Sequence, residues 1–340
     1  MMDTKILKTT ENDIKTAGEI IRGGGLVAFP TETVYGLGAS AYDADAAKKI
    51  YKAKGRPSDN PLIVHVCDKA QIEEVAREIP ENALRAIEKF MPGPITVILK
   101  KRDTIPDDVT AGLDTVAVRC PDNETARMLI SAAGVPIAAP SANISGKPSP
   151  TNSKHVINDM TGRIDAIING GNCRVGVEST IVDFSSDKPV ILRPGGVTYD
   201  ALREAGIDVV TDKNIFQSVS ENEAPKCPGM KYKHYAPDAE VTVVEGEKDA
   251  VQNKIKELIE ENKGKIIGVL AMYGAEYDDA VILAAGETNK EYAKNLFSAL
   301  REFDELGVEI VFAEFCERDG YGPAVKNRLY KAAAQRVIHV

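Results

Sequence analysis

The sequence lacks tryptophan altogether and holds only four histidines and five cysteines among its 340 residues. The cysteines include no CxxC pair and the histidines show no metal-ligand spacing, which argues against a protein-bound metal and against a disulfide framework. No run of about 18 apolar residues occurs, so we expect no membrane-spanning helix. The amino-terminal segment has no apolar core of signal-peptide length, and a cytoplasmic location without membrane contact follows as the default.

The sequence also has fewer basic than acidic residues, with 42 lysines and arginines and 51 aspartates and glutamates, so its net charge is −9. A protein whose main task is to hold a nucleic-acid backbone is usually basic. Any charge that binds phosphate must therefore be concentrated locally. The sequence also has no GxSxG, no GxGxxG and no Walker A motif, so neither covalent catalysis by a serine triad nor a standard nucleotide loop is predicted.

What is present alternates short apolar strands with amphipathic helices. Residues 1–211 predict an α/β domain with a mixed sheet of many strands. Its strands are expected at 26–30, 62–66, 95–100, 115–119, 137–140, 165–170, 179–184 and 190–195, and its helices at 12–22, 43–52, 70–78, 82–90, 123–132 and 152–159. Residues 241–340 alternate strictly, with a last helix at 323–337, and predict a small doubly wound, Rossmann-like parallel sheet.

Residues 212–240 separate the two domains and show little periodicity. A segment of this length without regular structure is usually either disordered or functional. The polar and aromatic run at residues 231–235 argues against plain disorder, and we predict that it folds as a lid over the first domain. A simple tether between the domains is the alternative.

The run PTETVYGLG, at residues 30–38, places Thr31, Glu32 and Thr33 where an apolar strand ends. Strand ends are where α/β proteins place ligand contacts. A capped polar turn is the alternative for this run.

Lys54 and Arg56 alternate with Gly55 and Pro57. Glycine and proline fix the backbone, so we expect both cations to project from a loop toward a polyphosphate, which needs cations at set separations. A solvated basic face at a helix end is the alternative.

Other candidates stand singly. His65 lies inside the strand LIVHV, where a satisfied core histidine is the simpler interpretation. Arg119 and Arg193 each end an apolar strand and face either a cleft or an ion-pair partner. Hydroxyl and amide groups gather in the loop 140–150 and at the start of the strand 179–184.

Seven motifs occur in a fixed order: PTETVYGLG, Lys54-x-Arg56, PGPIT, VAVRCP, APSAN, ESTIVD and LRPG. In this order the sequence resembles the Sua5/YrdC family of threonylcarbamoyl-AMP synthases, and the linker and second domain resemble its two-domain Sua5 type. The resemblance implies a twisted open sheet with a positively lined cavity. It also implies synthesis of threonylcarbamoyl-AMP and pyrophosphate from L-threonine, bicarbonate or CO₂, and ATP, for the N6-threonylcarbamoyladenosine (t6A) modification of tRNA by a separate transferase.

The resemblance also implies roles for individual residues. L-Threonine would contact Thr33, His65, Arg119 and Ser179. ATP would contact Lys54, Arg56, Asn60, Thr115, Ser141, Asn143, Ser149, Arg193 and Tyr232. Lys54 and Arg56 would act in catalysis, and Mg²⁺ would arrive on the ATP phosphates. Direct contact with tRNA is left open. An RNA-binding module with a basic cavity, or a nucleotide or amino-acid sensor without turnover, are the alternative functions.

Overall fold

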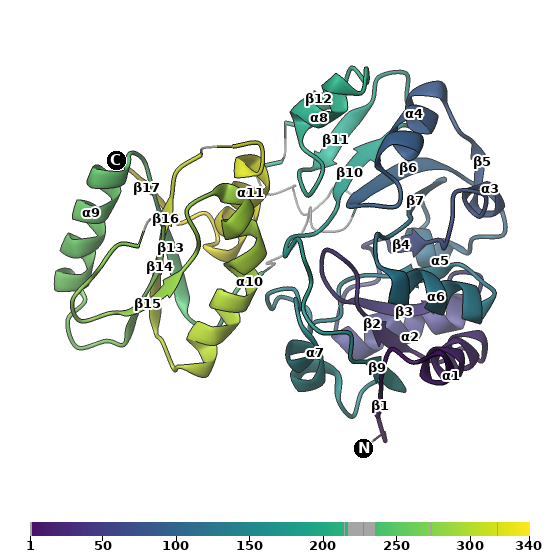
Figure 1. The fold of residues 1–340 in the computed structure, drawn as a ribbon, viewed down its shortest axis with the longest axis horizontal. Coiled ribbons are helices and arrows are strands. Elements are labelled where there is room, and N and C mark those ends of the chain that lie inside the picture. The colour runs from purple at the N-terminus through teal and green to yellow at the C-terminus, as the bar shows by residue number, and fades with distance from the viewer. Residues whose placement is uncertain (1, 214, 217–226, 228–234, 273, 318) are drawn as a thin grey trace. The chain divides into compact units, whose positions relative to one another are not determined.

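The computed structural model describes residues 2–340 except 214, 217–226, 228–234, 273 and 318 (Figure 1). The chain divides into two compact units. The first comprises residues 1–145, 149–174 and 178–231, and the second comprises residues 146–148, 175–177 and 232–340. Both are of the α/β class, as the sequence predicted, with a large mixed sheet in the first unit and a smaller parallel sheet in the second.

The sheet of the first unit has 12 strands among the described residues, in the order β1-β9-β2-β3-β8-β4-β7-β6-β10-β11-β12, with β5 beside β6. The strands are β1 (Lys5–Leu7), β2 (Val27–Phe29), β3 (Gly36–Ser40), β4 (Ile63–His65), β5 (Ala76–Glu78), β6 (Ile95–Lys101), β7 (Thr115–Arg119), β8 (Ile137–Ala139), β9 (Ala166–Ile168), β10 (Thr180–Asp183), β11 (Val190–Arg193) and β12 (Val210–Thr211). The helices are α1 (Glu11–Arg22), α2 (Ala44–Lys54), α3 (Ile72–Val75), α4 (Glu81–Phe90), α5 (Asp107–Thr110), α6 (Glu124–Ala133), α7 (Ser153–Met160) and α8 (Tyr199–Glu204).

The longer helices begin and end at residues that cap them. The Asp43 side chain accepts hydrogen bonds from the first turn of α2, and Gly55 ends that helix in the left-handed conformation. Asn123 and Gly134 do the same for α6. Helices α1 and α6 approach closely because Gly18 has no side chain: a Cβ there would lie 2.7 Å from the main chain of Ala132.

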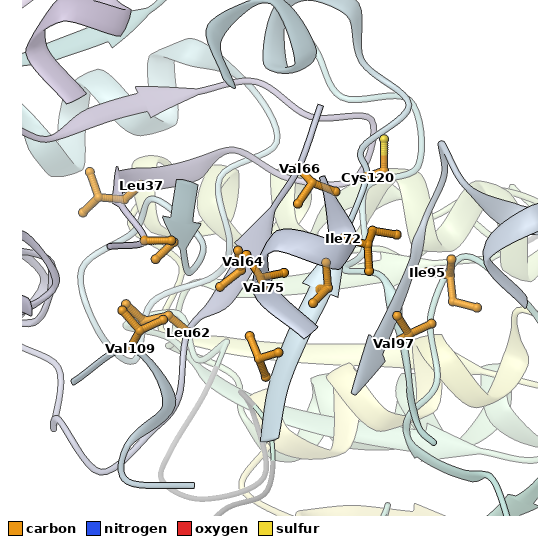
Figure 2. Packing of buried hydrophobic residues seen from close by; sticks show 14 of the residues in the cluster. Leu37, Leu62, Val64, Val66, Ile72, Val75, Ile95, Val97, Val109 and Cys120 are labelled. Carbon is orange, nitrogen blue, oxygen red and sulfur yellow. The ribbon is translucent and has the colours of Figure 1, made fainter. Parts of the chain in front are cut away.

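One face of the first sheet packs on the main hydrophobic core. Strand residues that alternate with outward-facing neighbours supply it, among them Val64 of β4, Val97 of β6 and Val116 and Val118 of β7. Figure 2 shows Val64, Leu62 and Val97 in this cluster, with Ile72 and Val75 of α3 beside them. Burying aliphatic side chains of this size contributes roughly 1.5–3 kcal/mol each.

On the opposite face, helices α1 and α6 cover one portion of the sheet. Residues of α1 and α6 pack against β2, β8 and β9 in a second cluster, which includes Phe29 and Ile137. Next to it, on β4, β7, β6 and β10, the same face carries a small apolar cluster of Ile63, Ala117, Ile181 and their neighbours. His65, Arg119 and Ser179, three of the polar candidates of the sequence, lie on or beside this second portion of the face.

The second unit holds a five-stranded sheet in the order β15-β14-β16-β13-β17, with every pair parallel. Helix α9 lies on one face, while α10 and α11 lie on the other (Figure 1). Its elements are β13 (Glu240–Glu245), α9 (Lys248–Glu261), β14 (Ile267–Ala271), β15 (Val281–Ala284), α10 (Asn289–Glu305), β16 (Ile310–Phe315), α11 (Gly322–Ala332) and β17 (Val337–His339).

Two predicted helices are wrong in part. The helix expected at 70–78 stops after α3, and residues 76–78 form β5 because they pair with β6. The helix expected at 323–337 ends at Ala332, and the last residues form β17, which pairs with β13. The strand β3, in the segment GLGAS, was not predicted at all.

Candidate functional site

Four of the predicted site residues occupy one face of the first sheet. Residues 115, 117 and 119 of β7 alternate with the core valines, and so do residues 63 and 65 of β4. Strands β4 and β7 run parallel and place His65 opposite Arg119. Ser179 lies just before β10, two residues ahead of Ile181, and therefore shares this face.

Arg119 is buried at the carboxyl end of β7 and forms an ion pair with Glu32. Its Nη2 atom lies 2.7 Å from Oε2 of Glu32, and the two side chains are 5% and 1% exposed. The same nitrogen lies 3.5 Å from the hydroxyl of Thr31, which in turn lies 2.9 Å from the hydroxyl of Thr33. The turn after β2 thus brings three consecutive polar residues to Arg119.

His65 is buried beside this pair. Its Nδ1 atom lies 3.0 Å from the main-chain oxygen of Ile63, and its ring meets the ring of Phe29 edge to face at 5.8 Å. Burial, followed by the positive charge of Arg119, lowers the pKa of His65 to about 3. The imidazole is therefore neutral near pH 7 and offers one donor and one acceptor.

Ser179 and Arg193 form one hydrogen-bonded cluster with Thr96. The hydroxyls of Ser179 and Thr96 lie 2.8 Å apart. Arg193 donates to the main-chain oxygen of Ser179 and, at 3.2 Å, to its hydroxyl. Arg193 is 5% exposed. It therefore makes a buried polar contact rather than the surface ion pair that the sequence left as an alternative.

Lys54 does not project from a loop, and the sequence prediction of its placement is wrong. It is the last residue of α2 and is 3% exposed. Its ammonium group donates to the main-chain oxygens of Ser141 and Asn143, the latter at 2.6 Å. The helix extended past its predicted end because Gly55, in the left-handed conformation, caps it there. Lys54 therefore holds the loop that carries the Ser-x-Asn motif.

Within that loop the hydroxyl of Ser141 donates to Oδ1 of Asn143 at 2.5 Å. Ser149, farther along, donates to Oε1 of Glu178 at 2.6 Å. The loop is tied to the PTETVYGLG segment through Tyr35, whose main-chain oxygen accepts from Ala142. Residues from three separated motifs thus meet in one network.

Arg56 and Asn60 lie beyond the end of α2. Arg56 is half-buried, donates to the main-chain oxygens of Asn60 and Pro61 at 3.3 Å, and lies over the ring of Tyr51. The amide side chain of Asn60 is fully buried and makes no hydrogen bond with any described residue. Thr115 begins β7 and is half-buried, so it lies at the opposite end of that strand from Arg119.

Tyr232 lies outside the described residues, as do its neighbours in the proposed lid up to residue 234. Cys227, which is described, is fully buried in the apolar cluster with Ile63, Ala117 and Ile181. Tyr235 stacks on Phe297 within the second unit. The lid stays a prediction.

Sequence reasoning assigned no role to Tyr35, Thr96 and Glu178, three polar residues of the site. It considered Thr31 and Glu32 as ligand contacts at a strand end but predicted no partner for either. All five lie inside motifs that the sequence singled out, and only their burial was not visible there. Thr96 is the last residue of PGPIT and carried no signal beyond that motif.

Two buried cysteines of the first unit, Cys120 and Cys173, are poorly suited to act as covalent nucleophiles. Burial raises the pKa of the Cys173 thiol to about 12 and that of Cys120 to about 11, so both stay protonated near neutral pH. Within the described ranges, no three His, Cys, Asp or Glu side chains gather in a way that could hold a metal ion. Of the helices that the structure describes, none combines the length and the apolarity needed to cross a bilayer. The arrangement is suited to binding a small polar molecule by charge and hydrogen bonds.

Comparison with known proteins agrees with this geometry. A family model described as "Telomere recombination" (Sua5, YciO and YrdC) matches residues 19–195, and one described as "Threonylcarbamoyl-AMP synthase, C-terminal domain" matches residues 197–334. The chain is 50% identical to threonylcarbamoyl-AMP synthase of Pyrococcus abyssi over 331 residues, with 96% of each chain covered. It is 46% identical to the Bacillus subtilis enzyme of that name, with 98% of this chain and 97% of the relative covered.

Among solved structures, P. abyssi Sua5 complexed with L-threonine superposes with a TM-score of 0.95 at 48% identity, covering 99% of this chain and all of that one. Escherichia coli YciO covers 58% of this chain at a TM-score of 0.52 and 25% identity. The fold and the relatives define a two-domain α/β enzyme of the nucleotidyltransferase type. The chain belongs to the Sua5/YrdC family, in its two-domain Sua5 form.

Proposed function

We propose that this enzyme is an L-threonylcarbamoyladenylate synthase, which forms threonylcarbamoyl-AMP and pyrophosphate from L-threonine, bicarbonate or CO₂, and ATP. The observation that carries the proposal is the buried polar group around Arg119, where a guanidinium, a neutral imidazole and threonine hydroxyls converge. It offers partners for the carboxylate and the hydroxyl of one amino acid. The names of the relatives, and a relative complexed with L-threonine, support the same substrate.

On the threonine side, Arg119 would bind the substrate carboxylate, since guanidinium and carboxylate match as charge-assisted partners. His65 and Thr33 would meet the hydroxyl group. Ser179 lies on the same sheet face and would contact the same molecule. Because His65 is neutral, it would bind the hydroxyl without adding a second positive charge.

On the nucleotide side we propose the cations Lys54, Arg56 and Arg193, together with the polar residues Asn60, Thr115, Ser141, Asn143, Ser149 and Tyr232. Lys54 would act in two ways: it fixes the Ser141–Asn143 loop and brings positive charge beside it. Arg56 is half-buried and would meet the phosphates more directly. Mg²⁺ would be carried by the ATP phosphates, whose oxygens are its preferred ligands.

The proposed reaction has two steps. The ammonium group of L-threonine first loses a proton to water, and the resulting amine captures CO₂ and releases a second proton to give a carbamate. A carbamate oxygen then attacks the α-phosphorus of ATP, and pyrophosphate leaves. Such phosphoryl chemistry depends on positioning and on neutralising charge rather than on a covalent nucleophile. The buried cations and hydroxyls meet that need, and the protonated thiols are not required.

We also propose that the product serves the t6A modification of tRNA through a separate transferase, and that the enzyme works in the cytoplasm. The proposed reaction does not require the enzyme itself to contact tRNA. The acidic total charge, −9, argues against a main role in holding a nucleic-acid backbone.

The direct test is to incubate the full-length protein with ATP, Mg²⁺, L-threonine and bicarbonate and to measure pyrophosphate. We expect release only when both L-threonine and bicarbonate are present. Equal release with either one omitted would contradict the proposal. Binding of RNA with a steep dependence on salt and no pyrophosphate would instead favour the RNA-binding module.

A further inference from the structure

The ion pair between Glu32 and Arg119 is incompletely satisfied. Both side chains are buried, yet neither carboxylate oxygen of Glu32 accepts a well-aligned hydrogen bond from any described residue, although Oε2 lies 2.7 Å from Arg119. The Nε atom of Arg119 likewise donates to none of the described residues. Three polar atoms of one pair are therefore buried without a hydrogen-bond partner.

This is a costly arrangement for a folded protein. Buried polar atoms are almost always hydrogen-bonded, and each one that is not costs roughly 1–3 kcal/mol, more when it belongs to a charged group. The need for a stable fold does not explain the pair either, because well-packed apolar residues at the same positions would often give the same or greater stability than a buried ion pair. These unsatisfied atoms are explained if Glu32 and Arg119 form part of a binding site, in which a bound molecule supplies the missing hydrogen-bond partners.

The two unsatisfied edges differ in chemistry. Nε of Arg119 is a cationic donor, so its best partner is an anionic acceptor. Oε1 of Glu32, the oxygen outside the ion pair, is an anionic acceptor, so its best partner is a cationic donor. Arg119 and Glu32 are within 2.7 Å of each other, so one small molecule must carry both groups close together. An α-amino acid in its zwitterionic form does so, with a carboxylate and an ammonium group on the same carbon.

We propose that Glu32 binds the ammonium group of the amino-acid substrate while Arg119 binds its carboxylate. The inference rests on the proposed function and extends it, since Glu32 then selects α-amino acids against acids that lack the amine. It also fixes the nitrogen, which reacts with CO₂ only after the ammonium group has lost a proton to water. The hydroxyl of Thr31 contacts both Arg119 and the hydroxyl of Thr33, and these contacts hold the turn that carries Glu32.

A purely structural role makes a different prediction. If Glu32 only orients Arg119, its loss weakens every ligand that uses the Arg119 contact, with or without an amine. If Glu32 binds the ammonium group, its loss weakens L-threonine alone. The pair of ligands L-threonine and (R)-3-hydroxybutanoate, which is threonine without its amino group, separates the two roles.

The experiment measures binding of both ligands to the full-length protein and to Glu32→Gln by calorimetric titration, competing the weaker ligand against the stronger. Wild-type protein should prefer L-threonine by at least about 10-fold, the value of a charge-assisted hydrogen bond. In Glu32→Gln the affinity for L-threonine should fall by about 10- to 100-fold. The affinity for (R)-3-hydroxybutanoate should stay within about threefold, and the preference should largely disappear.

Each contrary result has a separate meaning. Equal weakening of both ligands, or no change in either, overturns the role of Glu32 and leaves the proposed function intact. Wild-type protein that binds L-threonine and the analogue equally well overturns it without any variant, which matters if Glu32→Gln fails to fold. Wild-type protein that binds no L-threonine overturns the proposed function itself. Glu32→Asp, which keeps the charge, should retain part of the preference.

Discussion

Arg193 donates two hydrogen bonds to the main-chain oxygen of Ser179, from Nε at 3.1 Å and from Nη2 at 3.0 Å. The contact joins two motifs that the sequence shows only as separate segments, ESTIVD and LRPG. The glycine of the second motif completes it, because a Cβ on Gly195 would lie 2.4 Å from the main chain of Glu178 and Thr180. The position of the Ser179 hydroxyl thus depends on the shape of the Arg193 side chain.

Arg193→Lys should lower turnover at least about 10-fold although it keeps the charge. A lysine cannot place two donors side by side on one oxygen, so Ser179 would lose a fixed neighbour. Arg203→Lys, an exposed arginine on α8, is the matched control and should leave turnover unchanged. Steady-state pyrophosphate release measures both variants. Normal activity in Arg193→Lys would show that charge alone matters there.

Lys54→Met should lower both activity and stability. A cation that projects from a loop, as the sequence predicted for Lys54, could be removed without loss of structure, but Lys54 is buried and donates to two main-chain oxygens. We expect turnover to fall at least about 10-fold and the free energy of unfolding to fall by about 1.5–3 kcal/mol. Lys52→Met, on the exposed side of the same helix, should change neither. Urea denaturation followed by circular dichroism, with a turnover assay, tests the pair; unchanged stability in Lys54→Met contradicts it.

Arg56→Gln should separate activity from stability. Arg56 is half-buried, and it donates to the main-chain oxygens of Asn60 and Pro61 over long distances, 3.3 Å each. Losing its charge beside the phosphates should reduce turnover at least about 10-fold, while the free energy of unfolding should change by less than about 1 kcal/mol. The same two assays apply. If Arg56→Gln is as active as the wild type, Arg56 does not bind phosphate, and the alternative of a solvated basic face at the helix end is favoured.

Alternation of apolar residues predicted most of the fold. The runs LIVHV, TVAVR and ITVILK are rich in β-branched residues, and each forms a strand at the expected place. Strand β3 escaped prediction because GLGAS contains no β-branched residue and forms a strand only by pairing with β2 and β8. Strand β5, with the sequence ARE, likewise lacks β-branched residues and forms by pairing with β6. Strand β17 contains Val337 and Ile338, and its first residue was assigned to the preceding helix because its partner, β13, is distant in the chain.

The sequence predicted candidate site residues but not the contacts between them. Motifs marked Thr33, His65, Arg119 and Ser179, and the structure places them on or beside one sheet face. The pairing of Arg119 with Glu32 could not be read from the sequence, because it depends on which strands lie side by side. The burial of Lys54 was missed because helix ends are uncertain by one or two residues, and here that uncertainty decides whether a cation is free or enclosed.

In the second unit, Tyr277→Phe should destabilise the sheet locally. The hydroxyl of Tyr277 and the main-chain nitrogen of Met272 both donate to Glu314, which is 2% exposed. Removing one donor leaves a buried carboxylate short of a partner and should cost about 1–3 kcal/mol. Hydrogen exchange of β14 and β16 in the full-length protein measures it. Tyr42→Phe, which breaks an exposed Tyr–Glu contact, is the control and should be near neutral; equal effects of the two changes would be inconsistent with this account.

The last prediction concerns His65 and pH. Burial lowers the pKa of His65 to about 3 in the folded protein, whereas an unfolded histidine titrates near about 6.5. As the pH falls below that unfolded value, the unfolded chain gains a proton that the folded protein refuses. The stability associated with neutral His65 is therefore complete above about pH 6.5 and is lost progressively toward pH 3, by at most about 1.4 kcal/mol per pH unit.

His65→Gln removes this titration. Between pH 7 and pH 5 the wild type should lose about 2 kcal/mol of stability relative to the variant, since carboxylate effects are common to both proteins and cancel in the difference. Urea denaturation followed by circular dichroism suits a chain without tryptophan. Histidine NMR gives an independent reading: the His65 ring signals, assigned by their absence in the variant, should not shift over this range. A His65 signal that titrates near pH 6.5, with parallel stability curves for the two proteins, would show that the imidazole is open to solvent and charged in the acidic half of that range.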